Sequence, residues 1–250
     1  MVASSSAHYA FTKQVLTITK PAWHDLATNK SRWASAKHHR KDTDSTMKVA
    51  IIGAGNVGKA LGGSIVRAGH DVVITARSAE HARAAAEQIG ARTADTNIDA
   101  VSNADVVILA VWYPVAMGQI APEIANAARG RVIIDVTNPV KPDLSGLATG
   151  EQSAAEELQQ KLPGARVVKA FNTVFGANQA NPRPDVQVLV AGDDADAKQQ
   201  VRHLAESLGM TTIDAGGLSA ARPLEEMALL NMQINATQGG DWTSRWTLDR

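Results

Sequence analysis

Three glycines with the spacing G-x-G-x-x-G have the residue types that bind a pyrophosphate. Gly53, Gly55 and Gly58 directly follow a short apolar run, residues 48–52, and precede a helical pattern over residues 59–67. Between a strand and a helix, the first glycine permits a tight turn, the second lets phosphate approach the backbone, and the third allows close packing. The N–H groups at the start of the helix then attract the phosphates. The predicted dinucleotide contacts here are Gly53, Ala54, Gly55, Asn56, Val57 and Gly58.

The end of the next apolar run indicates which dinucleotide binds. Residues 71–75 form this run, and the chain continues through Thr75, Arg77 and Ser78 without an acidic residue. A site for NAD usually has Asp or Glu at this point to accept hydrogen bonds from the ribose 2′-hydroxyl. Arg77 offers a planar set of donors that suits a 2′-phosphate, and Thr75 and Ser78 add hydroxyl donors. We therefore expect NADP(H). The alternative is that Arg77 is a solvated loop cation.

Apolar runs alternate with helical patterns along most of the chain. This alternation predicts an α/β fold of the Rossmann type, with a parallel, doubly wound sheet. The expected strands are residues 48–52, 71–75, a short one within 92–103, 105–111, 131–136, 166–171, 186–191 and 211–214. The expected helices are residues 59–67, 79–89, a short one within 92–103, 115–128, 153–162, 195–208 and 223–236.

The same patterns predict three segments. Residues 1–46 lack a convincing period and are expected to be a disordered, dispensable leader, because Met47 lies one residue before the first strand. Residues 47–180 are expected to form the NADP-binding domain. Residues 181–250, where the pattern restarts, are expected to form a small C-terminal α/β lobe for substrate and dimer contacts.

Ligands of open α/β sheets bind outside the carboxyl ends of the strands, so the residues that follow each strand are further candidates. Asn172 could make a polar contact to the acceptor ring or the nicotinamide amide, or it could be an ordinary turn residue. Trp112 could form a wall of the nicotinamide pocket or cap the sheet. The further cofactor candidates are Ala110, Val111, Trp112, Asn138 and Pro139, and the substrate candidates are Asn172, Thr173, Val174, Gly217 and Leu218.

Composition excludes several classes of function. Among 250 residues, 25 basic and 25 acidic side chains balance, so neither nucleic acid nor an anionic membrane is expected as a partner. No apolar run is long enough to span a bilayer. The chain has no cysteine, which excludes disulfides and thiolate metal sites and fits a cytoplasmic protein. The histidines are scattered over separate elements, and we assign neither a catalytic residue nor a metal ligand.

Several stretches resemble the deazaflavin-dependent NADP oxidoreductases, whose best-known members transfer hydride between NADPH and coenzyme F420. Residues 48–62 resemble the opening of that family, and residues 75–78 resemble its 2′-phosphate loop. The more selective stretches are residues 168–174, 190–194 and 214–225. The likeness runs in order from Met47 to about Asn235. It implies an NADPH-dependent oxidoreductase with a small-molecule hydride acceptor.

The resemblance leaves the acceptor open. Asn172 stands where the archaeal enzymes tend to have His. The stretch Phe171-Asn172-Thr173 instead resembles a bacterial subgroup and the NADPH-flavin domain of the six-transmembrane metalloreductases. Coenzyme F420, FMN and FAD are therefore all candidate acceptors. The alternatives are an NADPH:flavin or ferric-type reductase, and a non-enzymatic NADP(H)-binding sensor. The resemblance also implies a homodimer, which the strongly apolar helix expected over residues 223–236 favours.

Overall fold

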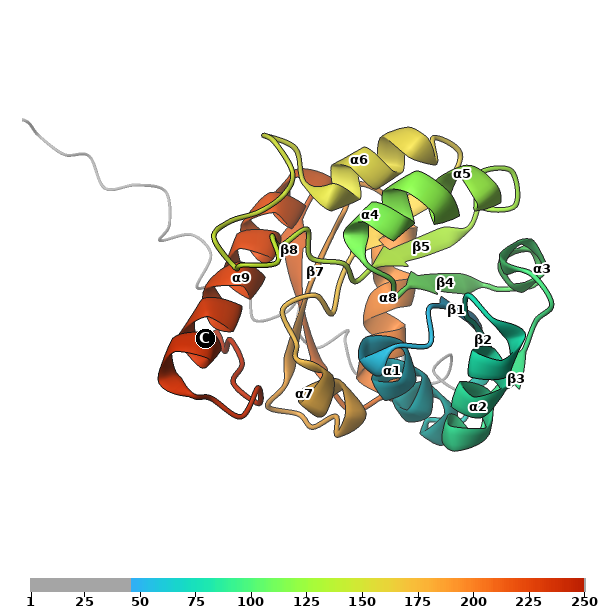
Figure 1. Ribbon diagram of the computed structural model, residues 1–250, viewed down its shortest axis with the longest axis horizontal. Helices are drawn as coiled ribbons and strands as arrows, with labels where there is room; N and C mark the ends of the chain where they lie inside the picture. The colour runs from blue at the N-terminus through green and yellow to red at the C-terminus, as the bar shows by residue number, and fades with distance from the viewer. Residues whose placement is uncertain (1–45, 250) are drawn as a thin grey trace, which may run out of the picture. The chain divides into compact units, whose positions relative to one another are not determined.

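The structure is a computed structural model that describes residues 46–249. The expected leader, residues 1–46, lies outside this range except for Thr46. The described strands form one sheet of eight in the order β3-β2-β1-β4-β5-β6-β7-β8 (Figure 1). Their bounds are β1 Lys48–Ile52, β2 Asp71–Thr75, β3 Arg92–Thr93, β4 Val106–Leu109, β5 Val132–Asp135, β6 Arg166–Lys169, β7 Gln187–Gly192 and β8 Thr211–Gly216. The first six run parallel, which confirms the doubly wound α/β class.

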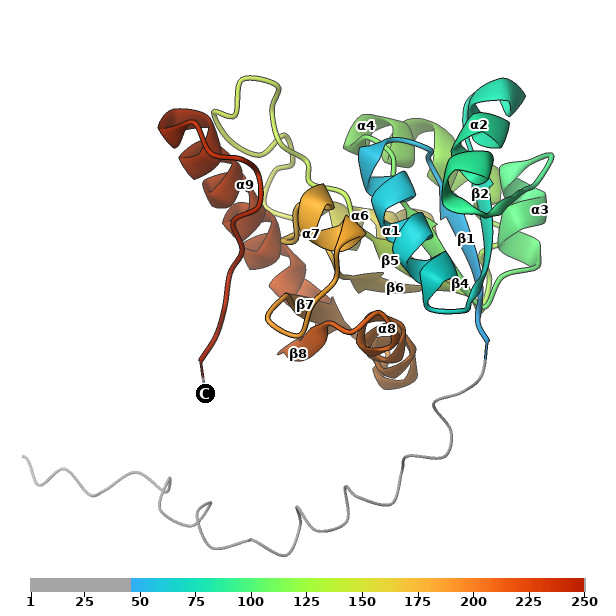
Figure 2. The same ribbon diagram turned by 90° about the horizontal axis from the view of Figure 1, so that it is seen from below.

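Helices cover both faces of the sheet (Figures 1 and 2). One face carries α1 Asn56–Arg67, α2 Ala79–Ile89 and α8 Ala195–Ser207, with α7 Gly176–Ala180 packed on α1. The other face carries α3 Asn97–Ser102, α4 Tyr113–Val115, α5 Ala121–Ile124, α6 Ala154–Lys161 and α9 Ala221–Gln238. A 3₁₀ turn, Leu218–Ala220, precedes α9. In the described part of the chain, no helix is both long and apolar enough to cross a membrane.

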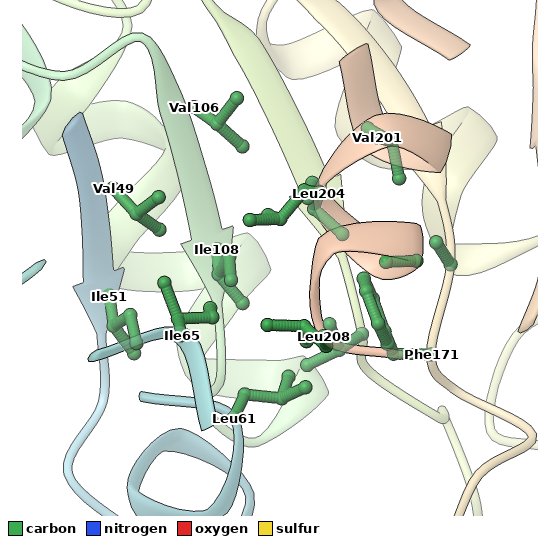
Figure 3. Close-up of a cluster of buried hydrophobic side chains, with 14 of the residues drawn as sticks. Val49, Ile51, Leu61, Ile65, Val106, Ile108, Phe171, Val201, Leu204 and Leu208 are labelled. Carbon is green, nitrogen blue, oxygen red and sulfur yellow. The ribbon is translucent and has the colours of Figure 1, made fainter. Parts of the chain in front are cut away.

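The strand sequences are continuous apolar runs, because helices cover both faces of the sheet and bury the side chains on both sides of each strand. In β1, Val49 and Ile51 face α1 and α8, whereas Ala50 and Ile52 face the layer that contains α3. Figure 3 shows the first of these two clusters, in which side chains of β1 and β4 meet those of α1 and α8. The labelled members are Val49, Ile51, Leu61, Ile65, Val106, Ile108, Phe171, Val201, Leu204 and Leu208.

The carboxyl-terminal strands differ from the expected all-parallel pattern. β7 runs antiparallel to β6, with Val168 opposite Gly192, and β8 then runs parallel to β7. Residues 181–249 therefore extend the same sheet, because β7 is hydrogen-bonded to β6 of the preceding segment. The assignment of substrate and dimer contacts to residues 181–250 stays a prediction.

The helix expected over residues 115–128 is interrupted. It consists of α4, a π-helical segment at Ala116–Ile120, and α5. Pro122 lies in the first turn of α5 and has no N–H to donate to the preceding turn, so a regular α-helical ladder cannot continue through it. The π-helical turn before Pro122 is wider than an α-helical turn and accommodates the missing hydrogen bond.

A buried charge cluster connects the end of the parallel sheet to α9. The ammonium of Lys169 donates to Asp135 Oδ2 at 2.9 Å, to Glu225 Oε1 at 2.7 Å and to the carbonyl of Thr137 at 2.6 Å. The side chains of Lys169, Asp135 and Glu225 are 0% exposed. Burial raises the pKa of Glu225, while Lys169 opposes this shift. Glu225 also accepts the N–H of Ala154 at 3.0 Å, which caps α6.

Removing the ammonium should destabilise the fold strongly. Lys169→Met leaves two carboxyl groups buried without their cation, and breaking such a buried pair costs about 3–5 kcal/mol. Urea unfolding should therefore show a large fall in the free energy of unfolding. The control is Arg92→Ala, because Arg92 pairs with Asp71 at a site where their side chains are 66% and 37% exposed. This exposed pair should contribute less than about 1 kcal/mol. Equal effects would contradict a stabilising role for the cluster.

Candidate functional site

A cleft of about 1120 Å³ lies at the carboxyl ends of β1, β2, β4 and β5. This is where the strand order reverses, since β4 pairs with β1 on the side opposite β2. Dinucleotides bind at such a switch point, and the volume is ample for one. A second cavity of about 480 Å³ lies among Lys48, Asp71 and Arg92 at the amino ends of the strands. It contains none of the predicted site residues.

The turn between β1 and α1 has the geometry that a pyrophosphate needs. Gly53 has φ +114°, and a Cβ there would lie 2.3 Å from the carbonyl oxygen of Ala110. A Cβ on Gly58 would lie 1.9 Å from the carbonyl oxygen of Gly53, so both positions require glycine. A Cβ on Gly55, in contrast, would meet no atom within 4 Å. Gly55 therefore borders open space at the start of α1.

The first N–H groups of α1 are available to a ligand. Gly55 is the N-cap of this helix, and no side chain caps it. Such N–H groups carry a partial positive charge and bind phosphate oxygens. Gly53, Ala54, Gly55, Asn56 and Val57 all line the cleft. Gly58 does not line it and acts through the close packing of α1 on the turn. The residues present therefore fit a dinucleotide.

Arg77 and Ser78 lie at the end of β2, exposed and lining the cleft. Ser78 caps α2 by accepting the N–H of His81 at 3.2 Å. Within residues 46–249, no hydrogen bond or ion pair engages the guanidinium of Arg77. It is available to an anion beside the amino terminus of α2, which adds a favourable dipole.

Thr75 has a different role from the one expected. Its hydroxyl is buried and donates to Asn97 Oδ1 at 2.6 Å, so it is not available to a 2′-phosphate in this arrangement. The amide of Asn97 in turn donates to Glu123 Oε2 at 2.9 Å. This chain of contacts joins β2 to α3 and α5 across the floor of the cleft. Arg77 and Ser78 remain as the candidate residues for contact with the 2′-phosphate.

Further side chains that the sequence did not reveal as candidates also line the cleft, among them Asn97, Gln119, Glu123 and Met232. Asn97 follows the short strand β3, so its place after a strand end was a usable signal. Gln119 belongs to the π-helical segment and Met232 to α9. No local pattern marks these two, because only packing brings them to the cleft.

The end of β4 contributes Ala110, Val111 and Trp112 to the lining of the cleft, and cofactor contact by these residues stays a prediction. Trp112 is 79% exposed, so it forms part of the rim and does not cap the sheet. The neighbouring Tyr113 also lines the cleft, and its hydroxyl donates to Glu157 Oε2 at 2.5 Å. Burial, together with the Glu157 carboxylate, raises the pKa of Tyr113 well above its usual range. The side chain of Tyr113 is therefore a neutral part of the cleft wall that its hydrogen bond to Glu157 holds in place.

The far end of the cleft is formed by the segment after β5. Val136, Thr137 and Asn138 line it. The amide of Asn138 donates to the carbonyl of Asn172 at 2.9 Å, so the segments after β5 and β6 are joined. Pro139, which we expected in the cofactor site, is buried and does not line the cleft. The expected substrate residues Asn172, Thr173 and Val174 are likewise buried behind this wall.

Gly217 and Leu218 lie away from the cleft lining. The side chain of Leu218 is buried in the cluster that contains Ala50 and Ala155, and its N–H donates to Asp193 Oδ1 at 2.8 Å. These contacts give Leu218 a packing role beneath α9. Substrate contact by Gly217 and Leu218 stays a prediction that this geometry does not favour.

Comparison with known proteins identifies relatives of two kinds. Residues 48–139 match the profile of the family described as NADP oxidoreductase, coenzyme F420-dependent. The F420-dependent NADP reductase of Methanothermobacter thermautotrophicus is 35% identical over 208 residues, which cover 76% of this chain and 89% of that protein. Metalloreductase STEAP3 of Rattus norvegicus is 32% identical over 186 residues, 73% of this chain. The match covers only 36% of that longer protein.

Solved structures agree with this fold. A crystal structure from Arthrobacter sp. FB24, described as a candidate F420-dependent NADP reductase, superposes with a TM-score of 0.72. The two sequences are 25% identical, and the match covers 82% of this chain and all of the other.

Arg77 should determine the preference between the two nicotinamide dinucleotides. Arg77→Ala should weaken NADPH tenfold or more, since a charge-assisted hydrogen bond contributes about 1.5–3 kcal/mol. NADH, which lacks the phosphate, should bind almost as before. Titrating both nucleotides against wild type, Arg77→Ala and the distant control Arg92→Ala gives the comparison. Equal weakening of NADPH and NADH by Arg77→Ala would make Arg77 structural, and a wild-type preference for NADH would overturn the assignment.

Proposed function

Since this chain belongs to the family of coenzyme F420-dependent NADP oxidoreductases, we propose that it transfers hydride between NADP(H) and the deazaflavin F420. The observation that carries the proposal is the cleft at the strand-order reversal. It combines an uncapped helix start behind Gly55 with an uncommitted Arg77 after β2. Together these suit a pyrophosphate and a 2′-phosphate.

The residues of the chain bind and orient the nucleotide along the cleft. Gly55 and the start of α1 receive the pyrophosphate, and Arg77 with Ser78 holds the 2′-phosphate. The remaining half of the nucleotide then extends past Val111 towards Asn138, where the cleft is walled by Tyr113 and Met232. The bound nicotinamide and acceptor rings supply the redox chemistry. The chain contributes position, and exclusion of water from the space between the rings.

A flavin is the second candidate acceptor. The resemblance of residues 171–173 to the NADPH-flavin domain of the six-transmembrane metalloreductases favours it, and metalloreductase STEAP3 matches 73% of this chain. FMN, FAD and a ferric chelate are then possible oxidants of NADPH. We also propose a cytoplasmic location, as expected from the sequence.

We also propose a homodimer formed through α9. Leu230 and Ile234 are one helical turn apart on this helix and are 47% and 38% exposed. Two large apolar side chains on one face of a helix favour a second protein surface. A second copy of the chain is the occupant that the family resemblance implies.

The acceptor is tested by measuring NADPH oxidation with coenzyme F420, FMN, FAD and ferric citrate in parallel. The expected result is turnover with F420 at a kcat/KM at least about tenfold above that with either flavin, since a dedicated site discriminates by its polar contacts. A higher value with FMN or FAD would favour the flavin reductase. Tight NADPH binding without turnover on any acceptor would favour a non-enzymatic sensor.

The dimer is tested by light scattering at micromolar concentration. Wild type should show twice the mass of one chain, and Leu230→Asp combined with Ile234→Asp should shift it to the monomer, because charges are poorly tolerated in an apolar interface. Ile98→Asp is the control, since Ile98 is 46% exposed on α3. A monomeric wild type would exclude the dimer.

A further inference from the structure

The side chains of Asn138 and Asn172 form a reciprocal pair whose orientation is determined. Asn138 Nδ2 donates to the carbonyl of Asn172 at 2.9 Å, and Asn172 Nδ2 donates to Asn138 Oδ1 at 3.0 Å. Asn172 Nδ2 also donates to the carbonyl of Leu224 at 3.0 Å. A carbonyl can only accept, so each amide has its nitrogen towards its carbonyl partner.

Asn172 has no side-chain hydrogen-bond donor left for a ligand. Its two Nδ2 hydrogens are both used, and the residue is only 6% exposed. Its Oδ1 is buried and has no hydrogen-bond partner among the described residues. A polar contact from Asn172 to a ring stays a prediction, and this geometry does not favour it. The side chain instead faces Asn138.

The backbone supports this placement of Asn172. Phe171 immediately before it is fully buried and has φ +62°, an uncommon conformation for a bulky residue. Its carbonyl accepts a hydrogen bond from Gln179 Nε2 at 3.2 Å. Strained residues of this kind persist where surrounding contacts hold them, often beside functional sites.

Asn138, in contrast, is partly exposed and lines the cleft. One Nδ2 hydrogen and one Oδ1 lone pair remain after its two bonds to Asn172. The preceding residue, Thr137, is held on both sides: its N–H donates to Asp135 Oδ1 at 2.9 Å and its carbonyl accepts from Lys169 at 2.6 Å. Pro139 restricts Asn138 to extended conformations. The amide of Asn138 is thus a rigid donor and acceptor.

Asn138 lies at the end of the cleft opposite Arg77. It follows β5, whereas Arg77 follows β2, and β1 and β4 lie between these strands. At about 4.8 Å per strand, the two ends are about 14 Å apart across the sheet. A dinucleotide that places its 2′-phosphate at Arg77 and its pyrophosphate at α1 places its other base near Asn138.

We propose that the Asn138 amide is the specificity contact at the reacting end of the cleft, and that Asn172 is a positioning residue that acts through it. An amide that presents one donor and one acceptor recognises a group with an adjacent C=O and N–H. The carboxamide of the nicotinamide and the pyrimidinedione edge of a flavin or deazaflavin both have this pattern. The proposal rests on the proposed function, because it takes the cleft as the nicotinamide site.

The ligand arm of the test compares NADPH with 2′,5′-ADP, which retains the phosphate end and lacks the nicotinamide. If Asn138 binds the carboxamide, Asn138→Ala should weaken NADPH about tenfold and leave 2′,5′-ADP unchanged. If Asn138 binds the acceptor, NADPH affinity should stay constant while KM for the acceptor rises by a similar factor. Either result supports the contact and identifies its source.

The positioning arm uses Asn172→Ala and the double variant. Asn172→Ala should reproduce the loss seen with Asn138→Ala, and it should have no further effect in the Asn138→Ala background. A merely structural role for Asn172 would instead give additive losses and would weaken 2′,5′-ADP as well. Melting temperatures are measured in parallel, because Asn172→Ala also removes the hydrogen bond to the carbonyl of Leu224.

Three results would overturn the inference: unchanged affinity and KM in Asn138→Ala, equal weakening of NADPH and 2′,5′-ADP in a folded variant, and additive losses in the double variant. If Asn138→Ala does not fold, Asn138→Ser replaces it, since serine keeps a short polar side chain but cannot present a donor and acceptor side by side. Failure of the proposed function can be told apart from failure of this inference. In that case the wild type would show no turnover, while its affinities for NADPH and 2′,5′-ADP could still be measured.

Discussion

The buried ammonium of Lys169 is the interaction on which the carboxyl half of the structure depends. It satisfies all three of its donors with Asp135, Thr137 and Glu225, and so joins β5, β6 and α9 in a fully buried region. Two carboxyl groups surround the one cation. They also accept hydrogen bonds from the backbone N–H groups of Thr137 and Ala154. A lysine with a fully buried side chain is tolerated only because each of its N–H donors has a hydrogen-bond partner. The carboxyl groups that face it have hydrogen-bond partners as well.

The two ends of the cleft are built in different ways. The phosphate end comes from one continuous segment, β1-turn-α1-β2, in which close backbone approach at Gly53 and Gly58 shapes the turn. The reacting end comes from segments far apart in the chain: the residues after β5, Asn172 after β6, and Met232 of α9. The charge cluster holds the first of these segments through both backbone groups of Thr137. Its role is therefore to give the reacting end a rigidity that local sequence does not provide.

The different construction of the two ends of the cleft explains how relatives with different acceptors can share one fold. The family profile covers residues 48–139, which contain the phosphate end and finish directly after Asn138. The side chain that orients Asn138 and the helix that walls the cleft both lie beyond residue 139. Changes after β6 and in α9 can thus alter the environment of the reacting ring without disturbing the nucleotide turn. The π-helical segment at Ala116–Ile120 adds a further variable wall.

The sequence by itself determined the features whose causes lie within a few tens of residues. These are the strand–turn–helix around Gly55, the position of Arg77 after β2, and the alternation of strands and helices. Only the tertiary structure decided the antiparallel pairing of β7 and the partners of the polar side chains. Thr75 was expected to face a phosphate but bonds Asn97. Asn172 was a candidate either for a ring contact or for a turn, and it bonds Asn138, 34 residues away. Lys169 and Glu225 are 56 residues apart. Residue type shows that such a group needs a partner, but which partner it finds depends on how the whole chain packs.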